Sequence, residues 1–120
     1  VKENGDHFFV VIDAATTELI RPALYNAYHH ISPYALLENT RVGDVVGPVC
    51  ESSDALAKNR DLPDFNSDDL LTIASAGAYA SSMGSTYNLR PLSPEILIGT
   101  DGKSRLIRRR QTFEEMIALY

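Results

Sequence analysis

The sequence lacks the features that mark secreted, membrane-spanning and disulfide-rich chains. Cys50 is its one cysteine, so an internal disulfide is impossible and a reducing compartment is the simpler expectation. The longest apolar runs, such as Phe8–Ile12, have five residues, whereas a helix needs about twenty to cross a bilayer. Residues 1–6 carry neither the basic leader nor the apolar core of a signal peptide. Because position 1 is not methionine, we expect a piece of a longer chain.

The chain is also short of basic residues. It has 16 Asp and Glu against 11 Lys and Arg, which gives a formal net charge of −5. Such a balance argues against phosphate backbones and anionic membranes as partners, so nucleic acid is not expected. With 120 residues, of which 44% are hydrophobic, the chain can bury a sufficient core without disulfides or metal. We therefore expect one globular domain over residues 1–120.

Short β-branched and apolar runs between turn residues predict strands. Phe8–Ile12 is expected to be a strand buried on both faces. Gly47-Pro48 interrupts another run and indicates an edge, a bulge or a close approach to other atoms. Asp101-Gly102 predicts the turn of a hairpin. The expected strands are Phe8–Ile12, Tyr34–Leu37, Asp44–Cys50, Leu70–Ala74, Glu95–Gly99 and Ser104–Arg109.

Helical signals are few. Apolar residues at three- and four-residue steps, with a proline in the first turn, predict a helix over about Arg21–His30. Thr112 as an N-cap, with Glu115 three residues later, predicts a last helix that reaches about Tyr120. The polar stretch Glu51–Asp69 is expected to be mostly loop. The sum is a mainly β domain, a sandwich or barrel, with two or three short helices.

One pair of residues fits an anion site. Arg21 and Tyr25 are four residues apart at the start of the expected helix, so both side chains fall on one face. A guanidinium and a phenol aimed at the same anion would form a carboxylate clamp. The spacing alone favours a plainer arrangement, an arginine at a helix end with a tyrosine packed beside it.

Three more residues have both a chemical and a structural interpretation. Cys50 and Glu51 place a thiol and a carboxylate at a strand end, on opposite sides unless the chain bends there. A lone cysteine is usually a small buried hydrophobe. Tyr79 lies among the small residues of Ala76–Gly84 and could approach a ligand closely, although a core tyrosine is the default.

Other polar residues favour structural interpretations. The sequence has no Walker loop, no Gly-x-Gly-x-x-Gly and no Cys-x-x-Cys pair. His29 and His30 would point about 100° apart on a helix, so solvated histidines at a helix end are expected rather than a metal pair. Arg108–Arg110 suggests an anion site, but a solvated strand end is favoured. Asp54 and Arg90 are expected to be structural rather than catalytic.

Several separated blocks agree in order and approximate spacing with one known family. They are Val11–Ala14 with Leu19–His29, Val46–Ser52, Ala76–Tyr79, Tyr87-Asn88, Arg90-Pro91 and Leu106–Arg110. Along nearly the whole chain they resemble the C-terminal domain of the diaminopimelate decarboxylases. The chain departs from the family pattern at Ser75, where an Asp commonly precedes Ala-Gly-Ala-Tyr, and at Thr16-Thr17, Ala80 and Gly84.

The resemblance implies a fold, a cofactor and a reaction. Members of this family are pyridoxal 5'-phosphate (PLP) decarboxylases of the alanine-racemase-like type, in which a β domain follows a (β/α)₈ barrel that carries the cofactor. The chain would be that β domain, without the barrel, of a cytoplasmic homodimer. The enzyme decarboxylates meso-2,6-diaminopimelate to L-lysine, the last step of lysine biosynthesis.

The resemblance also implies roles for five residues. Those matching Arg21 and Tyr25 bind the carboxylate at the non-reacting end of the substrate, and Glu51 pairs with the amino group there. Cys50 is the proton donor to the carbon that loses carbon dioxide, and Tyr79 contacts the cofactor and takes part in substrate binding. In family dimers the Cys50–Glu51 segment completes the partner's site, whereas Arg21, Tyr25 and Tyr79 serve their own.

The chemistry needs a lysine that binds the cofactor covalently and a phosphate cradle. Only Lys2, Lys58 and Lys103 are present, all in polar contexts and without a Gly-rich cradle. We therefore expect the essential lysine to lie outside this chain. We also expect the chain alone to bind PLP weakly or not at all and to have no turnover.

Two alternatives stay open. A related ornithine, arginine or carboxynorspermidine decarboxylase would share the fold, although a diamine-forming substrate without a distal carboxylate has no need of the clamp. A non-catalytic interaction module of the same fold would also fit. About 250 to 300 upstream residues with barrel periodicity in the same reading frame would exclude that module.

Overall fold

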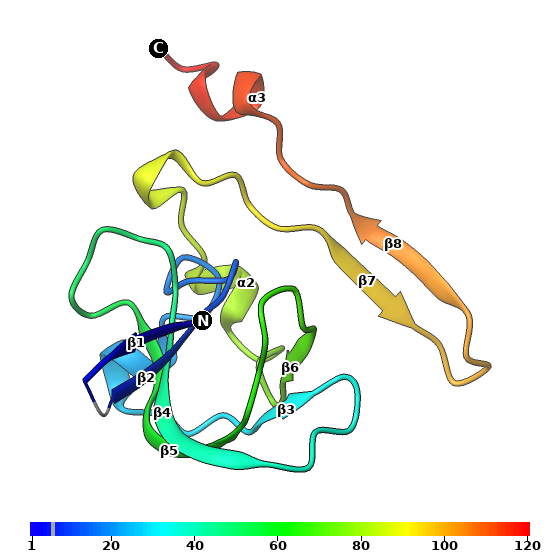
Figure 1. The fold of residues 1–120 in the computed structure, drawn as a ribbon. Helices are drawn as coiled ribbons and strands as arrows, with labels where there is room; N and C mark the ends of the chain where they lie inside the picture. The colour runs from blue at the N-terminus through cyan, green and yellow to red at the C-terminus, as the bar shows by residue number, and fades with distance from the viewer. Residues whose placement is uncertain (6) are drawn as a thin grey trace. The chain divides into compact units, whose positions relative to one another are not determined.

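A computed structural model describes residues 1–5 and 7–120, in which eight strands, three α-helices and one 3₁₀-helix form (Figure 1). The predicted fold class, mainly β with short helices, is confirmed. These residues divide into two units, 1–84 and 85–120. No helix in the described part of the chain combines the length and the hydropathy of a membrane span.

A four-stranded sheet forms the frame of the first unit, in the order β1-β2-β4-β5 (Figure 1). Strand β2 pairs in parallel with β4, and the other neighbours are antiparallel. Phe8 and Val10 of β2 are buried, whereas Val11 is exposed. The strand is confirmed, but burial on both of its faces was the wrong expectation. The sheet strands are β1 (Lys2–Asn4), β2 (His7–Val11), β4 (Thr40–Val46) and β5 (Ala55–Pro63).

Strand β5 is the longest strand of the described residues and occupies the middle of Glu51–Asp69, a stretch expected to be mostly loop. Its polar residues Lys58, Asn59 and Asp61 are exposed, while Leu56 and Leu62 are buried. The pairing with β4 shifts register after Gly43, and Asn59 takes a left-handed φ of 49°. This irregularity interrupts the two-residue alternation by which a strand is recognised in a sequence.

A second pair of strands covers part of the core. Strand β3 (Ile31–Pro33) is antiparallel to β6 (Leu71–Ile73), which confirms the strand expected at 70–74. The strand expected at Tyr34–Leu37 is wrong, because those residues follow β3 and leave the sheet. Leu36 is 99% exposed.

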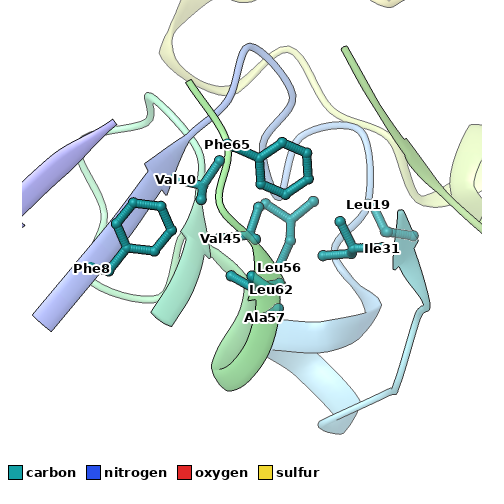
Figure 2. Packing of buried hydrophobic residues seen from close by; sticks show 9 residues of the cluster. All are labelled: Phe8, Val10, Leu19, Ile31, Val45, Leu56, Ala57, Leu62 and Phe65. Atoms are coloured by element: carbon teal, nitrogen blue, oxygen red, sulfur yellow. The ribbon is translucent and has the colours of Figure 1, made fainter. Parts of the chain in front are cut away.

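Side chains from these strands and their connections meet in one hydrophobic cluster, which Figure 2 shows from close by. Val45 of β4 and Leu56 of β5 both belong to it and are 0% and 1% exposed. The cluster consists of Phe8, Val10, Leu19, Ile31, Val45, Leu56, Ala57, Leu62 and Phe65.

Two short helices belong to the first unit, α1 (Arg21–Tyr25) and α2 (Ala80–Met83). The helix expected to reach His30 ends at Tyr25, because Asn26 adopts a left-handed φ of 52° and Ala27 N–H bonds back to the carbonyl of Arg21. Left-handed residues are a common way to close a helix. The chain then continues into β3.

The second unit contains a hairpin and a capped helix. Strands β7 (Glu95–Ile98) and β8 (Ser104–Arg108) are antiparallel, as predicted, and follow the 3₁₀-helix η1 (Tyr87–Leu89). Helix α3 (Phe113–Ile117) begins with the predicted capping box of Thr112 and Glu115 and ends before the expected Tyr120.

Ion pairs account for two of the three consecutive arginines. Arg108 contacts Glu95 at 3.0 Å, and Arg109 forms a two-armed pair with Glu115. The expectation of a solvated strand end holds for Arg109 and Arg110, which are exposed, whereas Arg108 is half-buried. The hydrogen bond from Arg109, and next the backbone N–H of Thr112, lower the pKa of Glu115 to about 2.

Truncation of Leu56 to alanine should destabilise the first unit by about 2–5 kcal/mol, because it leaves a cavity at the centre of the cluster. Urea denaturation followed by circular dichroism would measure the change. Leu36→Ala is the matched control, with an expected effect within about 0.5 kcal/mol because Leu36 is exposed. Equal effects of the two variants would contradict the described core.

The Arg109–Glu115 pair should make the stability of α3 depend on pH. The pKa of Glu115 in the folded state lies below its unfolded value of about 4.3. The stabilisation that ionised Glu115 gives to the folded state is therefore complete above about pH 4.3 and is lost as the pH falls through about 2. A carbon NMR titration of the Glu115 carboxyl should show a higher pKa in the Arg109→Gln variant than in the unmodified chain. Arg110→Gln removes the same charge one residue away and should leave the titration unchanged.

Candidate functional site

Arg21 and Tyr79, far apart in the sequence, lie next to each other in the structure. Arg21 is half-buried at the start of α1, and its guanidinium carbon is 5.7 Å from the centre of the Tyr79 ring. This distance is within the range of a cation–π contact. Among the described residues, no carboxylate lies within ion-pair distance of Arg21. The guanidinium is thus held against a ring while its charge is left for another anion.

Tyr79 is placed by an unusual backbone conformation. It precedes α2 with a left-handed φ of 66°, and its carbonyl accepts hydrogen bonds from Met83 N–H and the Ser82 hydroxyl. Its side chain is 66% exposed. The default expectation of a core tyrosine is therefore wrong, and the ring is available to a ligand.

Tyr25 lies on the same side of α1 as Arg21, because the two residues are four apart on the helix. It is 61% exposed, so its hydroxyl is open to a ligand. The structure thus supplies a guanidinium and two phenols on neighbouring elements. The guanidinium and the two phenol groups are hydrogen-bond donors, and a carboxylate accepts hydrogen bonds from such groups.

Cys50 and Glu51 lie on a tight turn between β4 and β5. The strand expected to reach Cys50 ends at Val46, and the chain bends there. Glu51 N–H donates to the carbonyl of Val49 at 2.8 Å. Both Cys50 and Glu51 are exposed, so the expectation that a lone cysteine is buried is wrong here.

Asp54 closes this turn from the inside. It is 3% exposed, and its carboxylate accepts hydrogen bonds from Val49 N–H at 2.8 Å and from Thr16 N–H at 2.7 Å. Its carbonyl accepts from Gly47 N–H at 3.1 Å. These contacts with the backbone agree with the structural role expected of Asp54.

The five predicted site residues lie outside two cavities of the first unit. One cavity, of about 710 Å³, lies between β2 and the 65–71 segment, and another, of about 400 Å³, lies between α1 and β5. None of the five lines either cavity. Four are exposed and Arg21 is half-buried. In this chain the candidate site is an open surface.

His29 is the polar residue that the sequence analysis misplaced. It is 2% exposed, not solvated, and its Nδ1 lies 3.2 Å from the carbonyl oxygen of Ala74. Arg60 donates to the carbonyl of His29 and stacks at 3.9 Å from the ring centre of Tyr28. His29 and His30 precede β3, and the sequence carries no signal that one of these two identical residues is buried and the other exposed.

The described residues contain no group of three or more His, Cys, Asp or Glu side chains arranged to hold a metal ion. All three lysines, Lys2, Lys58 and Lys103, are exposed. Lys103 lies 3.9 Å from Asp101 in the hairpin turn.

Comparison with known families gives this geometry a context. A family model described as "Pyridoxal-dependent decarboxylase, C-terminal sheet domain" matches residues 1–77, more than half of the chain. The chain therefore belongs to this family of decarboxylase sheet domains.

Named relatives extend the likeness to the second unit. Diaminopimelate decarboxylase of Zymomonas mobilis is 45% identical over 117 residues, which are 98% of this chain and 28% of the relative. The Campylobacter jejuni enzyme of the same name is 49% identical over 119 residues, 98% of this chain and 29% of the relative. This chain thus spans less than a third of the length of these relatives.

A solved structure agrees with the fold. The crystal structure of diaminopimelate decarboxylase from Helicobacter pylori complexed with L-lysine matches with a TM-score of 0.90 and 39% identity. The match covers 99% of this chain and 29% of that one. These findings confirm the resemblance to the C-terminal domain of diaminopimelate decarboxylases.

The residues present fit one side of a PLP site. Tyr79 offers an exposed aromatic ring, and the neighbouring Arg21 guanidinium suits an anionic group on the molecule bound there. Residues other than Arg21 and Tyr79 would supply the covalent attachment of PLP and the site for its phosphate group. This division agrees with a family in which the sheet domain is one part of a longer enzyme.

Gly47→Ala should disturb the turn that carries Cys50. An added Cβ would lie 2.4 Å from the Asp54 carboxylate and 2.7 Å from the Ala14 carbonyl oxygen, so we expect a loss of about 1–3 kcal/mol. Gly77→Ala is the matched control, because its Cβ would meet nothing within 4 Å. Thermal unfolding of both variants would measure the difference, and equal melting temperatures would contradict the described turn.

Proposed function

We propose that this chain is the C-terminal β domain of a diaminopimelate decarboxylase, a PLP-dependent carboxy-lyase that converts meso-2,6-diaminopimelate to L-lysine. The observation that carries the proposal is identity of 45–49% over nearly the whole chain to enzymes of that name. The contact between half-buried Arg21 and exposed Tyr79 supports it from the geometry. In this proposal an N-terminal barrel precedes the chain and the enzyme is a cytoplasmic homodimer.

Arg21 and Tyr25 bind the carboxylate at the end of the substrate that does not react. The guanidinium lacks a carboxylate partner among the described residues, so a bound carboxylate would supply one. Glu51 binds the amino group at the same end. A substrate head with both charges is thereby distinguished from one that carries the amine alone, since the latter leaves Arg21 unpaired.

Cys50 acts at the other end of the substrate as the general acid. When bound, PLP supplies the electron sink for the decarboxylation, and Tyr79 would contact it. The bond between the reacting carbon and its carboxyl group breaks. Carbon dioxide leaves, and both electrons of the broken bond stay on the reacting carbon. The thiol of Cys50 then gives its proton to that carbon and becomes a thiolate.

The open surface around these residues fits a site shared between subunits. In the proposed dimer, Cys50 and Glu51 enter the active site of the partner, whereas Arg21, Tyr25 and Tyr79 stay with their own. Cys50 and Glu51 are exposed on a turn, as residues that enter the active site of a partner subunit must be. A turn can project across an interface while the sheet below it holds its base in place.

Two substitutions in the intact enzyme that carries this chain test the proposal. Arg21→Ala should raise KM for diaminopimelate by about 10- to 100-fold, because a charged hydrogen-bond partner is lost. Cys50→Ala should lower kcat by about 10²- to 10⁴-fold, because the general acid is lost. Steady-state assays of lysine formation give both values.

Arg110→Ala provides the control, since Arg110 is an exposed arginine on the other unit. Normal lysine synthesis by the Arg21 and Cys50 variants would overturn the proposal. Faster turnover of ornithine or arginine than of diaminopimelate would favour a related decarboxylase. No turnover of any of these substrates would favour a non-catalytic module.

A further inference from the structure

We infer that Asp54 is a positioning residue for the reaction, because its buried carboxylate sets the place of the turn that carries Cys50 and Glu51. The inference rests on the proposed function. Asp54 does not touch the substrate in this account. It acts through the main chain of the turn and of the 14–18 loop.

The two carboxylate oxygens of Asp54 serve two different segments. Oδ2 accepts the N–H of Val49, the residue before Cys50, at 2.8 Å. Oδ1 accepts the N–H of Thr16 at 2.7 Å. The side chain therefore ties the thiol-bearing turn to the loop that leads into α1 and Arg21.

The loop on the other side of this link is itself well defined. Glu18 accepts the N–H of Ala15 at 2.8 Å, and Leu19 N–H donates to the carbonyl of Ala15 at 3.0 Å. Leu19 is anchored in the hydrophobic cluster, and Arg21 follows two residues later. Asp54 thus connects the Cys50 turn to a part of the chain that the core holds still.

A carboxylate is the group that this position requires. Both of its partners are N–H donors, and an ionised carboxylate is an acceptor at both oxygens. An asparagine of nearly the same shape has one oxygen and one NH₂, so it would set a donor against a donor at either Val49 or Thr16. A buried N–H left without a partner is costly, so the turn is expected to shift in this variant.

The base of the turn, at Gly47 and Asp54, is tightly packed, whereas Cys50 and Glu51 above it are exposed. Asp54 is 3% exposed, and a Cβ at Gly47 would come within 2.4 Å of its Oδ2. Placement errors of about 1 Å at a reacting group can lower a rate by about 100-fold. A displaced turn would move the Cys50 thiol from the reacting carbon and Glu51 from the substrate amine together.

The test uses Asp54→Asn in the intact enzyme. We expect kcat per folded active site to fall by about 10- to 100-fold and KM for diaminopimelate to rise, because Cys50 and Glu51 move as one unit. The rate of Cys50 alkylation by iodoacetamide, followed by mass spectrometry of the peptide that contains Cys50, should change several-fold. A merely structural role would lower the folded fraction and leave KM and the alkylation rate of the folded enzyme unchanged.

Asp64→Asn is the matched control. It makes the same change of charge at an exposed carboxylate, 3.6 Å from Arg41, and should leave kcat, KM and alkylation at their original values. If Asp54→Asn behaves like this control, the inference is overturned. Cys50→Ala distinguishes failure of the inference from failure of the proposed function. Full activity of Cys50→Ala would overturn the proposed function. An inactive Cys50→Ala enzyme together with a fully active Asp54→Asn enzyme would overturn only the inference about Asp54.

Hydrogen exchange of the unmodified enzyme covers the case in which Asp54→Asn does not fold. The amides of Val49 and Thr16 should exchange slowly, because each donates to the buried carboxylate. Exchange of both at unprotected rates would show that the link is absent and would overturn the inference.

Discussion

The carboxylate of Asp54 is the point at which the scaffold and the functional surface meet. The sheet explains where β4 and β5 lie, but a sheet leaves the path of the chain between two strands undefined. Here that path is fixed by a buried charge that two backbone N–H groups satisfy. The price of burying such a group is offset only while both bonds are made, so the turn at Cys50 has one preferred arrangement.

The exposure of the candidate site has an energetic consequence. An exposed ion pair in water contributes about 0–1 kcal/mol, too little for a guanidinium to select a carboxylate strongly. The same pair becomes stronger where water is excluded, because the effective dielectric falls. Arg21 is half-buried against Tyr79, which is one step toward such a site. Under the proposed function, selective recognition by Arg21 and Tyr25 would depend on another surface that covers them, and the relatives are several times longer than this chain.

Local signals in the sequence were sufficient for some elements and not for others. The β7–β8 hairpin and the Thr112 capping box depend on neighbouring residues, and both were predicted. Strand β5 and the early end of α1 depend on partners or on left-handed residues such as Asn26 and Asn59, and neither was predicted. Propensity alone does not contain those tertiary constraints.

The same division holds for the candidate site. The spacing of Arg21 and Tyr25 on a helix could be predicted from the sequence, and their chemistry followed from residue type. The contact between Arg21 and Tyr79 could not, because it depends on how α1 and the segment before α2 pack. That contact bears on the two interpretations of Arg21, a carboxylate clamp and an arginine at a helix end with a tyrosine packed beside it. A guanidinium at a free helix end would need no partner beyond water, but one that is half-buried against a ring has lost part of its hydration and gains from an anion that replaces it. The contact is therefore compatible with the proposed function, in which Arg21 binds a substrate carboxylate.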